Sequence, residues 1–193
     1  MLCVDGLVDS ELAIVFHNLQ CAAILLNKHY CDRTPIDGRL LRESLGFIHS
    51  SLIELEDRFK DKLSECLHLG MMAFLATTFR LPGLYEQPYC KNLTNKLQLS
   101  YNATKVSIPD LPKTIDNWLM LVCLISTDNL GDSIELASWR ATLICGLSWN
   151  EMRSQLKRVM WIDVFHNDLG RRAFEVLMAP LESSNVFNNA QIT

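Results

Sequence analysis

The residues best suited to chemistry in the first part of the chain are two histidine and cysteine pairs, His17 with Cys21 and His29 with Cys31. Because a helix turns once about every 3.6 residues, the spacing of four places His17 and Cys21 on one face. An imidazole and a thiolate are ligands that zinc accepts, but the sequence offers no close third and fourth ligand. His17 also follows Phe16 in an apolar segment. We therefore predict packing histidines here, and no metal or cofactor in this chain.

The seven cysteines lie far apart, at positions 3, 21, 31, 66, 90, 123 and 145. A zinc cluster or finger needs close cysteine pairs, which are missing from this sequence. The number is odd, and Cys123 and Cys145 lie in apolar stretches. This usage is typical of reduced thiols in an intracellular protein.

Motifs that would indicate an enzyme are also missing from the sequence. It contains no Gly-x-x-x-x-Gly-Lys-Ser/Thr phosphate loop, no Gly-x-Gly-x-x-Gly, no His-Glu-x-x-His and no Gly-x-Ser-x-Gly. Acidic residues in segment 54–62 alternate with basic ones, which is typical of a solvated helix face rather than of paired general acids. We predict no catalytic residues and no enzymatic activity.

Two polar residues each precede a glutamate by three positions, which is the spacing of a capping box. They are Ser148 with Glu151 and Asp132 with Glu135. In such a box the first side chain accepts a hydrogen bond from the backbone amide of the glutamate, and the glutamate accepts one from the amide of the first residue. Helices are therefore expected to begin at both places, and the helix after Asp132 carries Trp139.

The segment after Ser148 has the apolar spacing of a half-buried helix. Apolar residues recur at steps of three and four, with basic and polar residues mostly between them: Met152, Leu156, Val159 and Met160. Trp149 and Trp161 bracket this stripe. A tryptophan buries a large apolar area but carries a ring N–H that needs a partner, so it usually anchors packing between helices. We predict that both tryptophans are core residues.

Apolar periodicity and turn residues predict further helices before this one. Asp9 or Ser10 is expected to cap the first, Pro35 to lie in the first turn of the second, and Asp110 to cap the helix that contains Trp118. The third should be central because it is almost entirely apolar. The segments are 10–30, 35–59, 64–80, 89–101 and one around Trp118.

The second helix carries a narrow apolar stripe, which is expected to pack internally rather than against a partner protein. Its residues alternate steps of four and three: Leu41, Leu45, Ile48, Leu52, Leu55 and Phe59.

Composition points to one folded helical domain. The chain has 193 residues, of which 49% are hydrophobic and 21% charged, so it can bury a substantial core. The fold expected is all-α, a single irregular domain of about seven to nine packed helices over residues 1–180, with a frayed tail at 181–193. No apolar stretch approaches the roughly 20 residues that span a membrane. The net charge of −4 is unsuited to neutralising DNA phosphates.

The order of motifs in the last third resembles a known family. A Trp118 helix is followed by a Trp139 helix, then by Gly-Leu-Ser-Trp-Asn-Glu at 146–151 and Leu-Lys-Arg-Val-Met-Trp-Ile-Asp at 156–163. This order resembles the all-helical regulatory region of fungal zinc-cluster transcription factors, most clearly over residues 111–177. The family-motif residues are Trp118, Trp139, Ser148, Trp149, Glu151, Leu156, Trp161 and Asp163.

The resemblance implies a transcription regulator of the nucleus, in which this chain is the regulatory half. Members of that family bind DNA through an N-terminal cysteine cluster, which this chain lacks. Contact with DNA would therefore need a region outside this chain. The helical body would bind protein partners, either the transcription machinery or a second copy, or sense a small effector.

A second hypothesis is a helical small-molecule-binding protein or enzyme with an apolar pocket. The methionine-rich segment Met71 to Phe79 and the Trp118 helix are the expected walls of that pocket. Methionine adapts its shape to ligands, although it also fills gaps in a core. A deep cavity with convergent polar groups would favour this hypothesis.

Overall fold

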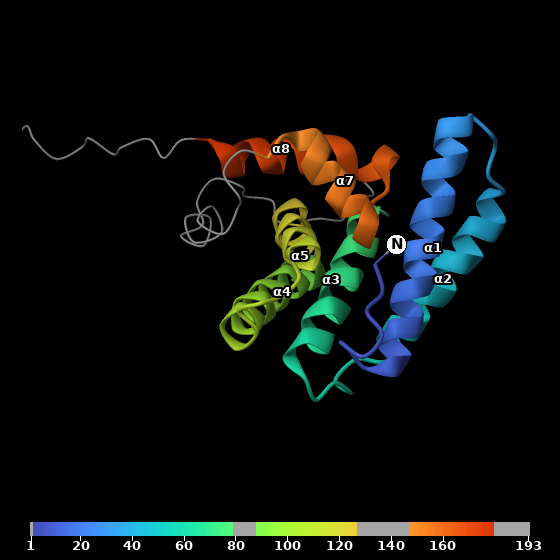
Figure 1. The fold of residues 1–193 in the computed structure, drawn as a ribbon. Coiled ribbons are helices and arrows are strands. Elements are labelled where there is room, and N and C mark those ends of the chain that lie inside the picture. Colours follow the sequence, from blue (N-terminus) through green and yellow to red (C-terminus); the bar gives the residue numbers. More distant parts are fainter. Residues whose placement is uncertain (1, 79–87, 127–146, 180–193) are drawn as a thin grey trace, which may run out of the picture.

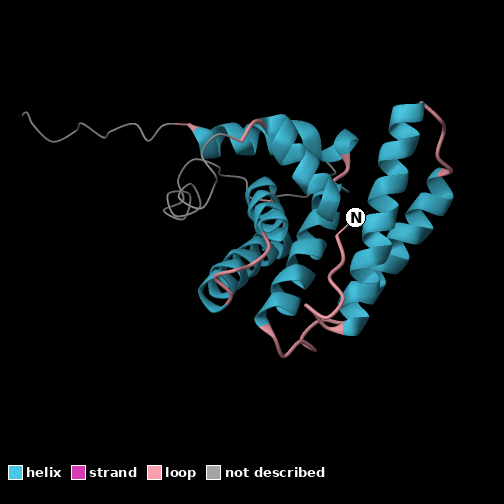
Figure 2. Cartoon of the chain, in the orientation of Figure 1, coloured by secondary structure: helices cyan, strands magenta, loops and turns pink. Residues whose placement is uncertain are grey.

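Helices account for most of the chain that the structure, a computed structural model, describes: residues 2–78, 88–126 and 147–179 (Figure 1). These residues contain no strand, so the predicted all-α class is confirmed (Figure 2). The described helices are seven: α1 (Ser10–Asp32), α2 (Gly38–Glu54), α3 (Lys62–Thr78), α4 (Pro88–Ser107), α5 (Lys113–Ile125), α7 (Trp149–Val159) and α8 (Asp163–Met178).

The helices pack around α5 and α3. In Figure 1, α1 and α2 form a hairpin on one side of α3, α4 and α5 lie on the other, and α7 and α8 cross one end. Every residue from Ile115 to Ile125 is at most 9% exposed, because α5 contacts α3, α4, α7 and α8. The predicted central position of the third helix is confirmed, since most residues of α3 are buried. None of the described helices is long and apolar enough to cross a membrane.

The start of α1 agrees with the sequence, but the start of α2 does not. Asp9 caps α1 by accepting hydrogen bonds from the amides of Glu11 and Leu12. The prediction that Pro35 opens α2 is wrong, because Asp37 caps that helix. Its carboxylate accepts hydrogen bonds from two backbone amides of the first turn, at 2.9 and 3.3 Å, so the helix begins at Gly38.

The apolar stripe of α2 packs internally as predicted but ends earlier. Its middle residues are buried: Leu45, Ile48, Leu52 and Leu55. The helix ends at Glu54, and Asp57 then takes a left-handed conformation with φ of 61° that turns the chain. Phe59 therefore lies outside the helix, partly buried against His68 at a centroid distance of 5.2 Å.

Two further boundaries differ from the prediction. The fourth helix runs to Ser107 rather than Tyr101, because buried Thr104 continues it and donates hydrogen bonds to the carbonyls of Lys62 and Ser100. Asp110 does not cap α5; the N-cap is Pro112, which makes no side-chain hydrogen bond there. The predicted capping box at Asp132, the helix with Trp139, and the tail 181–193 lie outside the described residues.

Gly170 is required by the packing of α8 against two tryptophans. A Cβ at this position would lie 2.5 Å from Cζ2 of Trp161 and 3.0 Å from Cη2 of Trp149. Both distances are too short for carbon atoms, and the rings are rigid. The small residue therefore allows the helix to approach the indoles.

Gly170→Ala should lower the free energy of unfolding by about 1–3 kcal/mol, because overpacking outweighs the gain in helix propensity. Gly46→Ala on α2 is the matched control: no atom lies within 4 Å of its Cβ position, so alanine should stabilise the protein by up to about 1 kcal/mol. Urea unfolding of both variants measures the difference. Equal stabilisation by the two substitutions would contradict the packing described for Trp161.

Candidate functional site

A buried turn connects α7 to α8, and three residues of the family motif, Trp118, Trp161 and Asp163, lie in it or next to it. The α7 helix ends at Val159, and residues 160–162 are extended before α8 begins at Asp163. Sequence spacing predicted that the helix would include Met160, but its φ of −164° places it in extended backbone. Residues 159–162 are at most 1% exposed. Their backbone groups cannot reach water and need partners within the protein.

Side chains of α1 and α5 supply partners for the carbonyls of this turn. Gln20 Nε2 donates hydrogen bonds to the carbonyl oxygens of Arg158 and Val159, at 2.9 and 2.7 Å. Trp118 Nε1 donates one to the carbonyl of Met160 at 2.7 Å. The indole N–H of Trp118 and the amide of Gln20 thus replace the bonds that a continued helix would have made.

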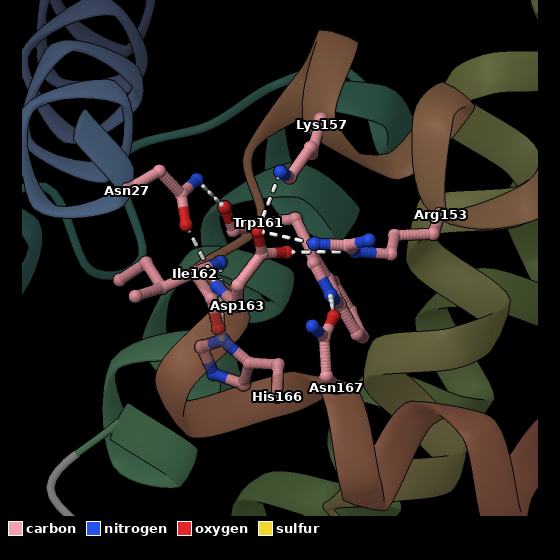
Figure 3. Close-up of polar contacts among 8 residues, drawn as sticks. All are labelled: Asn27, Arg153, Lys157, Trp161, Ile162, Asp163, His166 and Asn167. Carbon is pink, nitrogen blue, oxygen red and sulfur yellow. Dashed lines mark hydrogen bonds and ion pairs between the residues drawn. The ribbon is translucent and has the colours of Figure 1, made fainter. Parts of the chain in front are cut away.

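A third side chain, Asn27 of α1, also bonds to the backbone at this turn (Figure 3). Its Nδ2 donates a hydrogen bond to the carbonyl of Trp161 at 2.6 Å, and its Oδ1 accepts one from the amide of Asp163 at 2.8 Å. The Asn27 side chain therefore satisfies two backbone groups at once: the carbonyl of Trp161 in the extended segment and the first amide of α8. Asn27 lies 134 residues before Trp161 and 136 residues before Asp163 in the sequence, so both hydrogen bonds are long-range.

Asp163 is a buried carboxylate held by two cations of α7 (Figure 3). Arg153 donates a two-pronged pair of hydrogen bonds, from Nε at 3.0 Å and Nη2 at 2.6 Å, and Lys157 Nζ lies 2.5 Å away. Burial would raise the pKa of Asp163, but the hydrogen bonds and charges of Arg153 and Lys157 outweigh burial and hold it below its usual value. The ion pairs fix the angle between α7 and α8.

His166 lies beneath the same turn and is fully buried. Its Nδ1 is 3.2 Å from the carbonyl oxygen of Ile162, and its Nε2 is 3.1 Å from the hydroxyl of Thr77 on α3. The ring stacks on Phe74 at a centroid distance of 4.4 Å. Burial lowers the pKa of His166 to about 4, so the imidazole is neutral at pH 7.

The aromatic rings complete the junction. Trp161 is 1% exposed and its Nε1 donates a hydrogen bond to Asn167 Oδ1 at 3.1 Å, which confirms its predicted place in the core. Trp149 is only partly buried; it packs edge-on against Trp161 and at a tilt against Phe174, at centroid distances of 6.4 and 5.8 Å. Trp149 therefore covers the core from its rim, rather than lying inside it.

The capping box at the start of α7 forms as predicted. Ser148 Oγ accepts a hydrogen bond from the amide of Glu151, and the amide of Ser148 donates one to the Glu151 carboxylate at 2.8 Å. These contacts with Ser148 hold the pKa of Glu151 below its usual value. Both residues are exposed, whereas Leu156, further along the same helix, is fully buried.

Of the eight family-motif residues, Trp139 lies outside the described residues; the other seven belong to α5, α7 or its N-cap, the turn, or the first residue of α8. The sequence patterns did not predict the α8 helix or three residues that serve the turn: Gln20, Asn27 and Gly170. Gln20 could have been found, because it is a polar residue on the apolar face of α1. The contacts of Asn27 span more than 130 residues and left no local signal.

No group of three or more potential metal ligands occurs within the described ranges, so nothing there fits a metal site. Cys21 Sγ and His17 Nε2 do lie 3.6 Å apart, but on an exposed face rather than in the predicted packing position. The polar groups of the turn are engaged with one another. The arrangement can anchor helices, and it presents no reactive group to a substrate.

The pocket expected between α3 and α5 is filled with side chains. Met71, Phe74 and Trp118 are all fully buried there. A Cβ at Gly70 of α3 would lie 2.9 Å from Cδ2 of Leu119, so the two helices are in close contact. Among the described residues, α3 and α5 are therefore closely packed where they meet.

An apolar hollow lies instead along the α1–α2 hairpin, here called the α1–α2 groove. It measures about 700 Å³. Three of its side chains are unusually exposed for apolar residues: Leu25 at 54%, Leu40 at 61% and Phe47 at 68%. Its main lining residues are Cys21, Leu25, His29, Leu40, Ser44 and Phe47.

Comparison with known proteins yields no relative. No family model, no curated protein and no solved structure matches the chain.

The neutral state of His166 makes stability depend on pH. The unfolded state binds a proton near pH 6.5, whereas the folded state binds it only near pH 4. Stability should therefore fall by about 3 kcal/mol as the pH drops from 6.5 to 4. Burial also lowers the pKa of His68, which makes stability fall in the same direction. The lowered pKa of Asp163 adds a further loss of stability below its unfolded pKa of 3.8.

Urea unfolding at pH 7 and pH 4.5 measures this loss. His166→Gln should be less stable at pH 7 but lose much less on acidification than the wild type. His49→Gln changes an exposed histidine of α2 and is the control, which should keep the wild-type pH dependence. An unchanged dependence in His166→Gln would show that His166 is not the group responsible.

Proposed function

We propose that this chain is the regulatory and interaction module of a transcription regulator, similar to the helical regulatory region of fungal zinc-cluster transcription factors. It acts in the nucleus and binds protein partners through exposed helix faces. Contact with DNA belongs to a region outside this chain. The module has no catalytic activity of its own.

One observation carries the proposal: residues that the resemblance selected from the sequence converge on one junction. Trp118 of α5 donates a hydrogen bond to the turn between α7 and α8, Trp161 lies in the turn itself, and Asp163 begins α8 directly after it. Three of the eight motif residues therefore belong to one physical unit of the structure. This supports descent of the α5–α7–α8 part from a domain that needed the same turn.

The net charge of the chain supports the proposal that a separate region binds DNA. A surface that binds DNA neutralises several phosphates with lysine and arginine. This chain carries 18 basic and 22 acidic residues, a net charge of −4. Such a balance fits binding to proteins better than binding to nucleic acid.

The exposed apolar side chains of the α1–α2 groove are the best described surface for a partner. Single exposed apolar residues are common on proteins, but a contiguous group indicates an interaction site. Leu25, Leu40 and Phe47 line one hollow and are each more than half exposed. The partner expected is a component of the transcription machinery or a second copy of the chain.

The second candidate function is binding of a small apolar effector. It is favoured by the volume of the α1–α2 groove, about 700 Å³, which lies in the range of small-molecule sites. This function would be compatible with the first if the effector changed partner binding.

A reporter experiment tests the main proposal. Residues 1–193 fused to a heterologous DNA-binding domain should change transcription of a reporter in yeast nuclei, relative to that domain alone. The combined substitution Leu25→Ser, Leu40→Ser and Phe47→Ser should reduce this change, because it removes the apolar partner surface. Reporter output is measured beside protein abundance.

The matched control is Leu99→Ser with Val106→Ser on α4, where both side chains are more than 70% exposed but lie outside the groove. This control should keep the activity of the fusion, and circular dichroism checks that both variants remain helical. Reporter output equal to that of the DNA-binding domain alone would contradict a regulatory role.

A further inference from the structure

Cys21 and His17 form a thiol–imidazole pair on the exposed side of α1. They are four residues apart, one helical turn, and the distance from Cys21 Sγ to His17 Nε2 is 3.6 Å. Both side chains are exposed to solvent. A thiol beside a ring nitrogen has the arrangement of an activated nucleophile, because the ring can take the proton as sulfur attacks.

Cys21 of this pair lies at the edge of an apolar surface, whereas His17 is one turn away from it and outside its lining. Cys21 lines the α1–α2 groove, in which Leu25, one turn further along α1, faces Leu40 and Phe47 of α2. An alkyl chain in this groove would cover apolar side chains that are now in water. The groove would thereby hold an apolar compound next to the sulfur.

We propose that Cys21 is a covalent capture site for an alkyl-chain α,β-unsaturated carbonyl compound. The Cys21 sulfur forms a bond to the β-carbon while the carbon–carbon π bond breaks and its electrons move toward the carbonyl oxygen. His17 takes the thiol proton and returns a proton to the α-carbon. All atoms of both reactants remain in the adduct, and the step needs no oxidant or metal.

The other described cysteines lack this combination of features. Cys66 and Cys123 are buried, and burial raises the pKa of Cys66 to about 12, which disfavours the reactive thiolate. Cys3 is exposed, but it donates its hydrogen bond to the carboxylate of Asp5 rather than to an imidazole.

Cys31 is the matched internal control. It is exposed and lies on the same helix as Cys21, but it makes no hydrogen bond to a histidine and does not line the groove. Its rate of modification therefore reports ordinary thiol reactivity in the same molecule.

This site does not depend on the proposed role in transcription. Capture is a property of the isolated chain and is measured without a reporter, whereas the reporter experiment uses no electrophile. A negative result in the reporter experiment therefore says nothing about covalent capture, and a negative result in the capture experiment says nothing about transcription.

Competition between the two cysteines tests the proposal. The full chain is treated separately with trans-2-nonenal, which carries an alkyl chain, and with acrylamide, which does not. Borohydride reduction followed by peptide mass spectrometry gives the rate of adduct formation at each cysteine. With nonenal, Cys21 should react at least about tenfold faster than Cys31. With acrylamide the preference should be clearly smaller.

Two substitutions separate the base from the groove. His17→Gln should slow the reaction of Cys21 with both reagents by about threefold and leave Cys31 unchanged. Phe47→Ser should lower the preference for nonenal over acrylamide at Cys21, whereas Leu99→Ser, an equally exposed change on α4, should not. These surface changes are expected to leave the fold intact, which circular dichroism checks.

Equal rates at Cys21 and Cys31 with nonenal would overturn the proposal. An unchanged rate at Cys21 in His17→Gln would overturn the role of the imidazole, and the same nonenal preference in Phe47→Ser and wild type would overturn the role of the groove.

Discussion

The structure depends on one constraint, which is that the buried turn between α7 and α8 must have its backbone polar groups satisfied. A buried carbonyl without a partner costs about 1–3 kcal/mol. Gln20 and Asn27 from α1 and Trp118 from α5 meet this need for four successive carbonyls, at residues 158–161. Satisfying the turn therefore fixes where α1 and α5 lie relative to α7 and α8. The buried ion pairs of Asp163 then set the angle between the two last helices.

This arrangement separates a rigid part of the molecule from the surface available for function. The junction is closed by its own contacts and offers no group to a ligand. The α1–α2 hairpin is held by the same junction through Gln20 and Asn27, but its outer side carries the apolar groove and the Cys21–His17 pair. A regulator that binds partners or an effector through the hairpin would thereby connect its binding surface to the core through α1.

Sequence patterns predicted the local features and missed the long-range ones. The class of fold, the capping box at Ser148 and the burial of Trp161 follow from spacing and composition within a few residues, and each is present. The start of α2 was misplaced because Asp37 is a better cap than the site at Pro35, and sequence alone did not rank the two. Asn27 and Gln20 could not be assigned to the turn, because their partners lie more than 130 residues away.

The most direct test of this account is the free energy of unfolding of Asn27→Ala compared with Asn18→Ala. Both substitutions remove an asparagine from α1, but Asn18 is exposed, whereas Asn27 bonds both the Trp161 carbonyl and the Asp163 amide. Asn27→Ala should cost about 2–4 kcal/mol because it leaves two buried groups unpaired, and Asn18→Ala should change stability by no more than about 0.5 kcal/mol. If both substitutions cost less than about 0.5 kcal/mol, the turn does not hold the helices together and the account is wrong.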